Sequence, residues 1–173
     1  MVKPNPRSFM RNLVAAALLL INSASPVWAQ DAVFSTKSLT PEAALSAAKA
    51  AMDSCRKSGF QVGVAVVDRS GITQVLLRDR FAGPHTVEVA ANKAWTAVSF
   101  RTATTALAVE TQASKPMSGL RSQPRFLAAG GGLPIEGGGS LLGGIGVSGA
   151  PGGDADDACA KAGIQSIADA LEF

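Results

Sequence analysis

The stretch GGGLPIEGGGSLLGGIGVSGAPGG, residues 130–153, decides how this chain folds. Twelve of its twenty-four residues are glycine, out of eighteen glycines in the whole chain. The apolar residues 133–135 and 141–147 predict two strands joined by a glycine turn. Strict alternation along the second strand places Leu142, Gly144 and Gly146 on one face and Leu141 on the other. That glycine face is almost bare backbone, so we expect a closely packed helix or a flat ligand against it.

Two known motifs overlap this stretch. Gly144, Gly146 and Gly149 have the spacing of the GxGxxG dinucleotide fingerprint, which must open a helix directly, whereas here a loop follows. Gly146 and Ser148 approach the G-x-S-x-G nucleophile elbow, but Ala150 stands at the second glycine position. Turns and close packing are therefore the better interpretation of these glycines.

Residues 1–29 have the layout of a secretory signal peptide. Basic residues precede an apolar run at 13–21, and Val27-Trp28-Ala29 resembles a cleavage site. The apolar run is too short to span a bilayer. We therefore expect export to the periplasm or the medium, with no integral membrane segment left after cleavage.

The remaining chain, residues 30–173, has the length of one ordinary domain. Three of the 16 basic residues leave with the signal and none of the 13 acidic ones, so the mature chain is neutral. A neutral chain with scattered charges lacks the electrostatic footprint of a nucleic-acid-binding protein or of a protein bound to an anionic membrane. Its expected partner is a small molecule.

The two cysteines, Cys55 and Cys159, lie far apart in the sequence. In an oxidising compartment such a pair is more often a disulfide than a metal site. His85 is the only histidine, which excludes a two-histidine zinc or iron site within one chain.

The expected elements alternate between helices and strands. Thr40 as N-cap and Pro41 at the first position begin a helix with an apolar stripe of Leu45, Ala48, Met52 and Cys55. Residues 61–68 and 72–78 form the strongest hairpin in the sequence. A second helix follows, capped by Thr86, and its expected buried stripe is Val87, Ala91, Ala94 and Val98.

A short helix over 102–111, a third strand over 125–129, the two strands of the glycine stretch and a last helix complete the pattern. This order predicts a mixed α+β fold, an antiparallel five-stranded sheet flanked by helices. If the first and last helices lie antiparallel on one face, the end of one meets the start of the other, which brings Cys55 to Cys159.

Three segments together resemble a known family: VGVAVVDRSG, then GPHTVEVAANKAWTAVSFRTAT, then the glycine stretch with its acidic helix start. The chain resembles the GlcG/HbpS family, which is similar to the C-terminal domain of PduO-type corrinoid adenosyltransferases. The resemblance covers nearly all of residues 30–173. It implies a profilin-like fold, homo-oligomers, and binding of haem or a related tetrapyrrole in some members. It implies no settled enzymatic activity.

The loop from Arg78 to Thr86 is the main candidate site. His85 lies between a strand end and a helix start, where functional groups gather, and its imidazole could ligate haem iron. A loop histidine that bonds the backbone is an equally good interpretation. Arg78 and Arg80 could bind a carboxylate or a propionate, although a solvated strand end explains them too.

Three further residues join this candidate site. Thr86 begins a helix whose free amides favour an anionic group. Glu88 could share the rim of a pocket with His85, and Ser148 lies in a turn whose amides could receive an anion. Exposed side chains and a structural turn are the alternatives.

The acidic run Asp154, Asp156 and Asp157 resembles a calcium cluster, but acids at a helix N-terminus also complement the helix dipole, which explains them better. Lys93 falls outside the expected buried stripe of its helix.

Three hypotheses remain open at this point. The first is an exported protein that holds haem or a similar ligand as a carrier or sensor accessory. The second is a small enzyme that acts on a small carboxylic acid or aldehyde, with His85 as acid/base and Arg80 as anion clamp. The third is a structural subunit of an oligomer.

Overall fold

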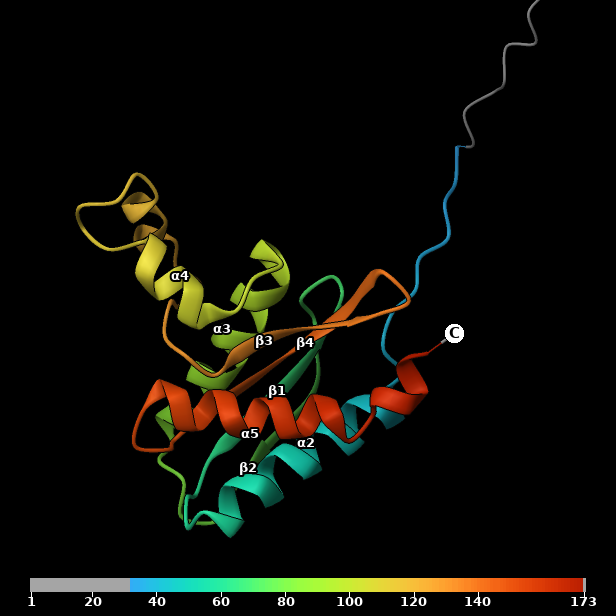
Figure 1. Cartoon of the computed structure of the whole chain (residues 1–173), viewed down its shortest axis with the longest axis horizontal. Helices are drawn as coiled ribbons and strands as arrows, with labels where there is room; N and C mark the ends of the chain where they lie inside the picture. The colour runs from blue at the N-terminus through green and yellow to red at the C-terminus, as the bar shows by residue number, and fades with distance from the viewer. Residues whose placement is uncertain (1–31, 173) are drawn as a thin grey trace, which may run out of the picture. The chain divides into compact units, whose positions relative to one another are not determined.

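The computed structural model describes residues 32–172, so the predicted signal peptide lies outside the described residues. Residues Thr36–Phe173 form one compact unit, drawn in Figure 1, and residues 32–35 precede it as irregular chain. Among the described residues, no helix is both long and apolar enough to cross a membrane.

The first helix, α2 (Pro41–Lys57), begins as the sequence predicts. The Thr40 hydroxyl accepts a hydrogen bond from the Ala43 amide at 3.2 Å, and Pro41 occupies the first turn. The buried side consists mainly of alanines, and Leu45 is exposed rather than buried. Small side chains on that side allow α2 to approach its neighbours closely.

The sheet is antiparallel throughout, with the order β2-β1-β4-β3. Its strands are β1 (Gly63–Asp68), β2 (Thr73–Arg78), β3 (Gly132–Gly137) and β4 (Ser140–Ser148). The mixed α+β prediction is confirmed, but the sheet of the described residues has four strands instead of five. The predicted strand over 125–129 is irregular, because Phe126 packs edge-to-face against Phe100, with ring centroids 5.1 Å apart.

Helices cover both faces of the sheet (Figure 1). Helix α3 (His85–Phe100) packs on one face, and α2 and α5 (Gly153–Gln165) lie side by side on the other. The larger hydrophobic core lies between the sheet and the α2/α5 pair. Shorter elements complete the fold: α4 (Thr104–Glu110), the 3-10 helix η2 (Ser118–Ser122) and the 3-10 helix η3 (Ala168–Leu171).

The glycine face of β4 receives helix α3. A Cβ atom at Gly146 would lie 2.0 Å from the Ala90 carbonyl oxygen, and one at Gly144 would lie 2.5 Å from Val98 Cγ2. Any side chain there would push the helix off the sheet. Of the two expected occupants of this face, a helix and a flat ligand, the structure has the helix.

The faces of β4 are partly exchanged relative to the prediction. Leu141 packs in the core on the α3 side, and Leu142 packs in the α2/α5 core. The cause is an irregularity in the β3–β4 pairing between Ile135 and Glu136, which breaks the strict alternation near the turn.

The predicted disulfide is present between Cys55 on α2 and Cys159 on α5. Both cysteines are buried, so the bond joins the two helices inside the core. The two helices lie antiparallel, as the sequence predicts, but Cys55 near the end of α2 meets Cys159 in the middle of α5 rather than at its start.

Candidate functional site

The loop between β2 and α3 carries the residues that the sequence singles out, and Asp79 anchors it. Asp79 is 2% exposed and accepts hydrogen bonds from Arg56 Nε at 2.7 Å and Arg56 Nη2 at 3.1 Å. The hydrogen bond from Arg56 lowers the pKa of Asp79 below its usual range, against the effect of burial. Sequence reasoning missed this anchor because its two residues lie 23 positions apart.

Three of the predicted site residues meet around Gly63. Gly63 pairs with Arg78 on one neighbouring strand and with Ser148 on the other. A Cβ atom at Gly63 would lie 2.8 Å from the Thr86 carbonyl oxygen, so α3 begins directly over this glycine. The structure therefore brings Arg78, Thr86 and Ser148 together.

These residues already have structural roles, however. Arg78 Nη1 donates a hydrogen bond to the Ala82 carbonyl at 2.6 Å. Thr86 and Ser148 are buried, at 1% and 6% exposure. An incoming ligand would find few of their polar groups free.

The prediction that Thr86 caps α3 is wrong. The helix begins at His85, one residue earlier, with Pro84 in the N-cap position and no side-chain cap. The Thr86 hydroxyl instead donates to the Gly83 carbonyl at 2.7 Å. Thr86 stabilises the turn that leads into the helix rather than the free amides of its first turn.

The other candidates at this end of α3, Arg80, His85 and Glu88, are exposed. A Cβ atom at Gly83 would lie 2.6 Å from Cε1 of His85, so the imidazole lies against the loop backbone. The side chains of all three make no hydrogen bond or ion pair within residues 32–172. They are accessible, but none of the three lines either of the two hollows described below.

A hollow of about 500 Å³ lies at the opposite end of α3. The residues that line it are Phe100, Pro116, Met117, Gly119 and Leu120. Arg121 holds the segment around η2 in place, since Nε donates to the Thr111 carbonyl at 2.7 Å and Nη2 to the Ala108 carbonyl at 3.1 Å. Figure 1 shows α4 and the segment after it extending beyond the sheet. The hollow is largely apolar and opens widely to solvent, so it offers a ligand an exposed apolar surface rather than an enclosed pocket.

Two cations are next in the chain to residues that line this hollow, although neither lines it. Arg101 follows Phe100 and Lys115 precedes Pro116, and both are exposed. Within the described residues, neither side chain makes a hydrogen bond or an ion pair. Residues 101–125 contain four basic residues and one acidic residue, Glu110. The neutral mature chain thus has a local excess of positive charge here, which the average composition conceals.

A second hollow, of about 210 Å³, lies at the N-terminal end of α2. Its lining is Ser38, Leu39, Thr40, Ala43, Leu142, Ala170 and Leu171. It has no charged lining residue. Among residues 32–172, no cluster of three or more histidine, cysteine or acidic residues could hold a metal ion.

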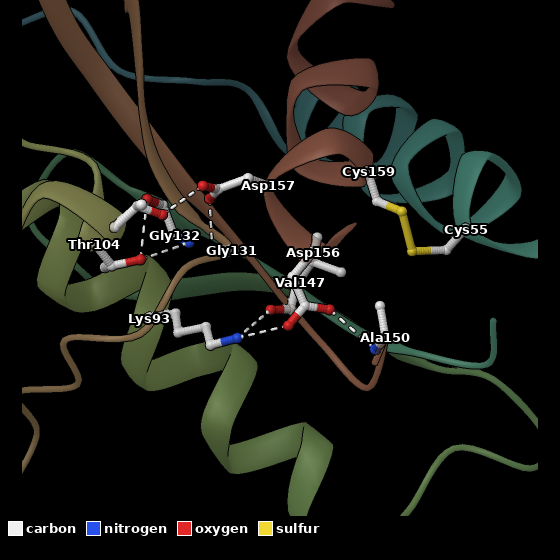
Figure 2. Close-up of polar contacts among 11 residues, drawn as sticks. Cys55, Lys93, Thr104, Gly131, Gly132, Val147, Ala150, Asp156, Asp157 and Cys159 are labelled. Atoms are coloured by element: carbon white, nitrogen blue, oxygen red, sulfur yellow. Dashed lines mark hydrogen bonds and ion pairs between the residues drawn. A yellow bond between two sulfur atoms is a disulfide. The ribbon is translucent and has the colours of Figure 1, made fainter. Parts of the chain in front are cut away.

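A buried ion pair lies between the two ends of α3. Lys93 Nζ is 2.8 Å from an Asp156 carboxylate oxygen and donates to the Val147 carbonyl at 2.9 Å (Figure 2). The other oxygen of Asp156 accepts from the Ala150 amide at 3.0 Å. Burial raises the pKa of Asp156 and outweighs the opposite effect of the hydrogen bond from Lys93.

Lys93 is therefore buried, contrary to its predicted position outside the stripe of α3. The buried side of α3 also contains Thr86, Ala90, Thr96 and Ala97 in place of the predicted Val87 and Ala91. Because α3 packs closely on the glycines of β4, the helix face that contacts the sheet contains small side chains. The Lys93 side chain extends to Asp156 at the start of α5. Its partner lies 63 residues away, so helical periodicity alone does not reveal it.

The acidic helix start also has a structural role. Asp157 accepts a hydrogen bond from the Gly131 amide at 2.6 Å (Figure 2). It accepts another from the Thr105 hydroxyl. Only Asp154 of the three acids is exposed and matches the simple dipole interpretation. The calcium interpretation does not fit, because Asp156 and Asp157 are occupied by partners from the protein.

The chain belongs to a known family. Residues 39–165 match the family of haem-degrading protein HbpS-like sequences, which confirms the resemblance seen in the sequence. HbpS from Streptomyces reticuli, solved as a double mutant, is 42% identical and has a TM-score of 0.73, covering 83% of this chain and 97% of that one.

Two further relatives are relevant to function. A solved complex of PduOC with haem is 32% identical, with a TM-score of 0.72, and covers 75% of this chain and 95% of that one. The corrinoid adenosyltransferase PduO of Salmonella typhimurium is 36% identical over 103 residues, which cover 58% of this chain and 31% of that protein. This chain thus spans about a third of the length of the PduO proteins it matches.

Proposed function

We propose that this member of the HbpS-like family is an exported haem-binding protein that acts as a haem carrier or as an accessory to a sensor. The observation that carries the proposal is its likeness to PduOC, a protein solved in complex with haem, at 32% identity and with a shared fold. The match to the HbpS-like family along residues 39–165 supports the same ligand class.

The residues present fit haem. The open, mainly apolar surface of the hollow suits one face of the macrocycle, and the cations next to its lining residues in the chain suit the two propionates. His85 and Met117 are exposed residues of types that ligate haem iron in proteins. Bound haem would supply an iron centre that takes up small ligands and changes oxidation state.

Export is part of the proposal, and the disulfide supports it. Disulfides persist in oxidising compartments, and Cys55–Cys159 is buried and bonded. We expect the mature protein to begin at or near Gln30 in the periplasm or the medium. Intact-mass measurement of fractionated cells tests this, and a full-length chain in the cytoplasm would refute it.

Native mass spectrometry of the exported protein tests the ligand and the assembly together. We expect a haem-sized added mass on a homo-oligomer. Titration of the purified protein with ferric haem should give a saturable Soret band with one haem per chain. A chain that binds no haem and turns over a small acid or aldehyde would favour the enzyme hypothesis, and an empty inert oligomer would favour the structural one.

A carrier must release its haem intact. Pigment extracted from the loaded protein after prolonged incubation should therefore be unmodified haem. Conversion of the pigment to open-chain products in the presence of reductant and oxygen would replace the carrier role with degradation.

A further inference from the structure

We propose that haem binds at the C-terminal end of α3, in the hollow lined by Phe100, Met117 and Leu120, and that Met117 ligates the iron. Arg101 and Lys115 then pair with the propionates. This inference rests on the proposed haem-binding function and moves its site away from His85. Four observations of the structure carry it.

The first observation is the inventory of iron ligands. Proteins hold haem iron mainly through histidine, cysteine, methionine or tyrosine. The chain has no tyrosine and one histidine, and both cysteines are disulfide-bonded. Of the methionines in the described residues, Met52 is buried in the core, and Met117 is 41% exposed and lines the hollow. Only His85 and Met117 remain.

The second observation is that these two ligands cannot belong to one site on a single chain. His85 begins α3 and Phe100 ends it. Fifteen helical steps separate them by about 22 Å, at 1.5 Å per residue. The haem must therefore choose one end of the helix.

The third observation is the difference in apolar surface. At the Met117 end, an aromatic ring, a proline and a leucine line a hollow of about 500 Å³. Phe126 packs against the Phe100 ring in an edge-to-face contact. At the His85 end, the loop residues line neither of the two hollows described above, and the large apolar side chain there, Phe81, is 81% exposed.

The fourth observation is charge. Arg101 ends α3 in the left-handed conformation at φ 49°, and it is the only residue other than glycine with positive φ in the described part of the chain. Glycine is favoured at that position, and a side chain there costs about 1 kcal/mol. The chain has a cation there nevertheless, beside the hollow and without a partner. Lys115 is the second such cation.

The His85 end of α3 has a buried hydrogen-bond acceptor that lacks a donor. Gln61, just before β1, has a buried Oε1 without a hydrogen-bond partner in the described residues. An ionised propionate has only acceptor oxygens, so it cannot donate a hydrogen bond to this Oε1 atom. Arg78 at the same end is already bonded to the Ala82 carbonyl.

The test is a titration of the purified full mature chain with ferric haem, read by the Soret band and by the near-infrared charge-transfer band of methionine-ligated ferric haem. In Met117→Leu, which keeps the apolar volume, the charge-transfer band should disappear and the Kd should rise about tenfold or more, the equivalent of one lost bond of about 1.4 kcal/mol. In Met117→His, binding should persist with an imidazole-type spectrum, which shows that position 117 faces the iron.

A blocking variant tests the hollow itself. A Cβ atom at Gly119 meets no protein atom within 4 Å, so Gly119→Phe should fold normally and fill the hollow. Its Kd should rise at least about tenfold, since the ring takes the place of the macrocycle. Gly152, the N-cap residue of α5, has the same open surroundings, so Gly152→Phe is the matched control and should bind as wild type.

Charge is tested by the double variant Arg101→Gln/Lys115→Gln. Loss of two exposed ion pairs should raise the Kd by about threefold to tenfold and weaken its salt dependence, with the iron-ligand spectrum unchanged. Lys49→Gln/Lys161→Gln, which removes two exposed lysines from α2 and α5, is the matched control and should leave the Kd unchanged.

The outcomes separate this inference from the proposed function. If wild type binds no haem, both fail. If wild type binds haem, and His85→Ala abolishes the Soret shift while the Met117 and Gly119 variants bind as wild type, the function stands and this site is wrong. Retention of the wild-type spectrum in His85→Ala, together with the losses above, supports the site.

Discussion

The two ends of helix α3 differ in how many of their functional side chains already have partners within the protein. At the N-terminal end, Asp79 is bonded to Arg56, Arg78 to the Ala82 carbonyl, and Thr86 to the Gly83 carbonyl. At the C-terminal end, Met117 lies in an apolar hollow, and Arg101 beside it has no partner in the described residues.

The difference teaches that residues with useful chemistry do not by themselves make a binding site. The loop from Arg78 to Thr86 has the richer set of polar side chains, but most of them hold the fold together. The hollow has fewer polar side chains, but its apolar surface and the charges next to it are available to a ligand. Four predictions test or sharpen this contrast, ordered by the size of the expected effect.

Removal of the disulfide should have the largest effect. Cys55→Ser/Cys159→Ser opens a link between residues 104 positions apart. The unfolding free energy should fall by up to about 4–5 kcal/mol in the chain-entropy account. Urea unfolding measures the loss, and an unchanged transition midpoint would contradict it.

The same variant sharpens the contrast between the ends. Arg56, which holds Asp79, directly follows Cys55 on α2. Hydrogen exchange should therefore accelerate more in residues 79–84 than in residues 116–120. Equal acceleration would show that the anchor at the N-terminal end does not depend on the bond between the helices.

Breaking the ion pair in the middle of α3 should cause the next largest loss of unfolding free energy. Lys93→Met leaves the carboxylate of Asp156 buried without its cation, and such changes cost about 3–5 kcal/mol. Both ends of α3 should be affected together, because the pair fixes the helix to the start of α5. Chemical denaturation measures the loss.

The double variant Lys93→Met/Asp156→Leu is the control for this pair. It removes both charges, so much of the lost stability should return. If the double variant is as unstable as the sum of the two single variants, the two residues do not act as a pair.

Oxidation should affect only the C-terminal end. Mild peroxide should convert exposed Met117 to the sulfoxide, while Met52, 5% exposed in the core, is protected. A polar sulfoxide in the hollow should raise the Kd for ferric haem by about tenfold. Methionine sulfoxide reductase should restore binding, and peptide mapping should identify the oxidised residue. Unchanged affinity after full oxidation of Met117 would argue against the hollow.

The smallest effect concerns the pH dependence of stability at the N-terminal end. The pKa of Asp79 is lowered from 3.8 in the folded protein, mainly by the hydrogen bond from Arg56. The folded state therefore favours the ionised carboxylate, and the resulting stability is present above pH 3.8 and lost as the pH falls through the lowered pKa. Arg56→Gln should lower stability at neutral pH, and its difference from wild type should shrink below about pH 4. A difference that is constant with pH would show that Arg56 acts by packing alone.

Local sequence signals predicted much of this fold. Thr40 and Pro41 mark the start of α2 correctly, because capping depends on residues that are neighbours in the chain. The glycine face of β4 and the pairing of Cys55 with Cys159 followed from strand alternation and helix order. The prediction of an extra strand at 125–129 was wrong. Phe126 packs against Phe100 in an irregular segment, and the local sequence pattern does not distinguish such a buried apolar residue from one in a strand.

The candidate site was harder to predict. Lys93 and Asp156 are 63 residues apart, and a lysine on a helix ordinarily indicates an exposed position. Met117 and Phe100 meet only after α4 turns the chain back, so neither their spacing nor their type indicates a shared hollow. One signal was present, namely the excess of basic residues over 101–125, which a count over the whole mature chain averages away.

The most direct test of where haem binds is a ¹H–¹⁵N NMR spectrum of the full mature chain loaded with ferric haem, compared with the same chain loaded with a diamagnetic gallium porphyrin. Paramagnetic iron broadens amide signals close to it, and the two ends of α3 are about 22 Å apart. We predict that the signals of Arg101 and of residues 117–120 disappear, while those of residues 83–88 remain sharp. Loss of the signals around His85 with sharp signals around Met117 would contradict the account.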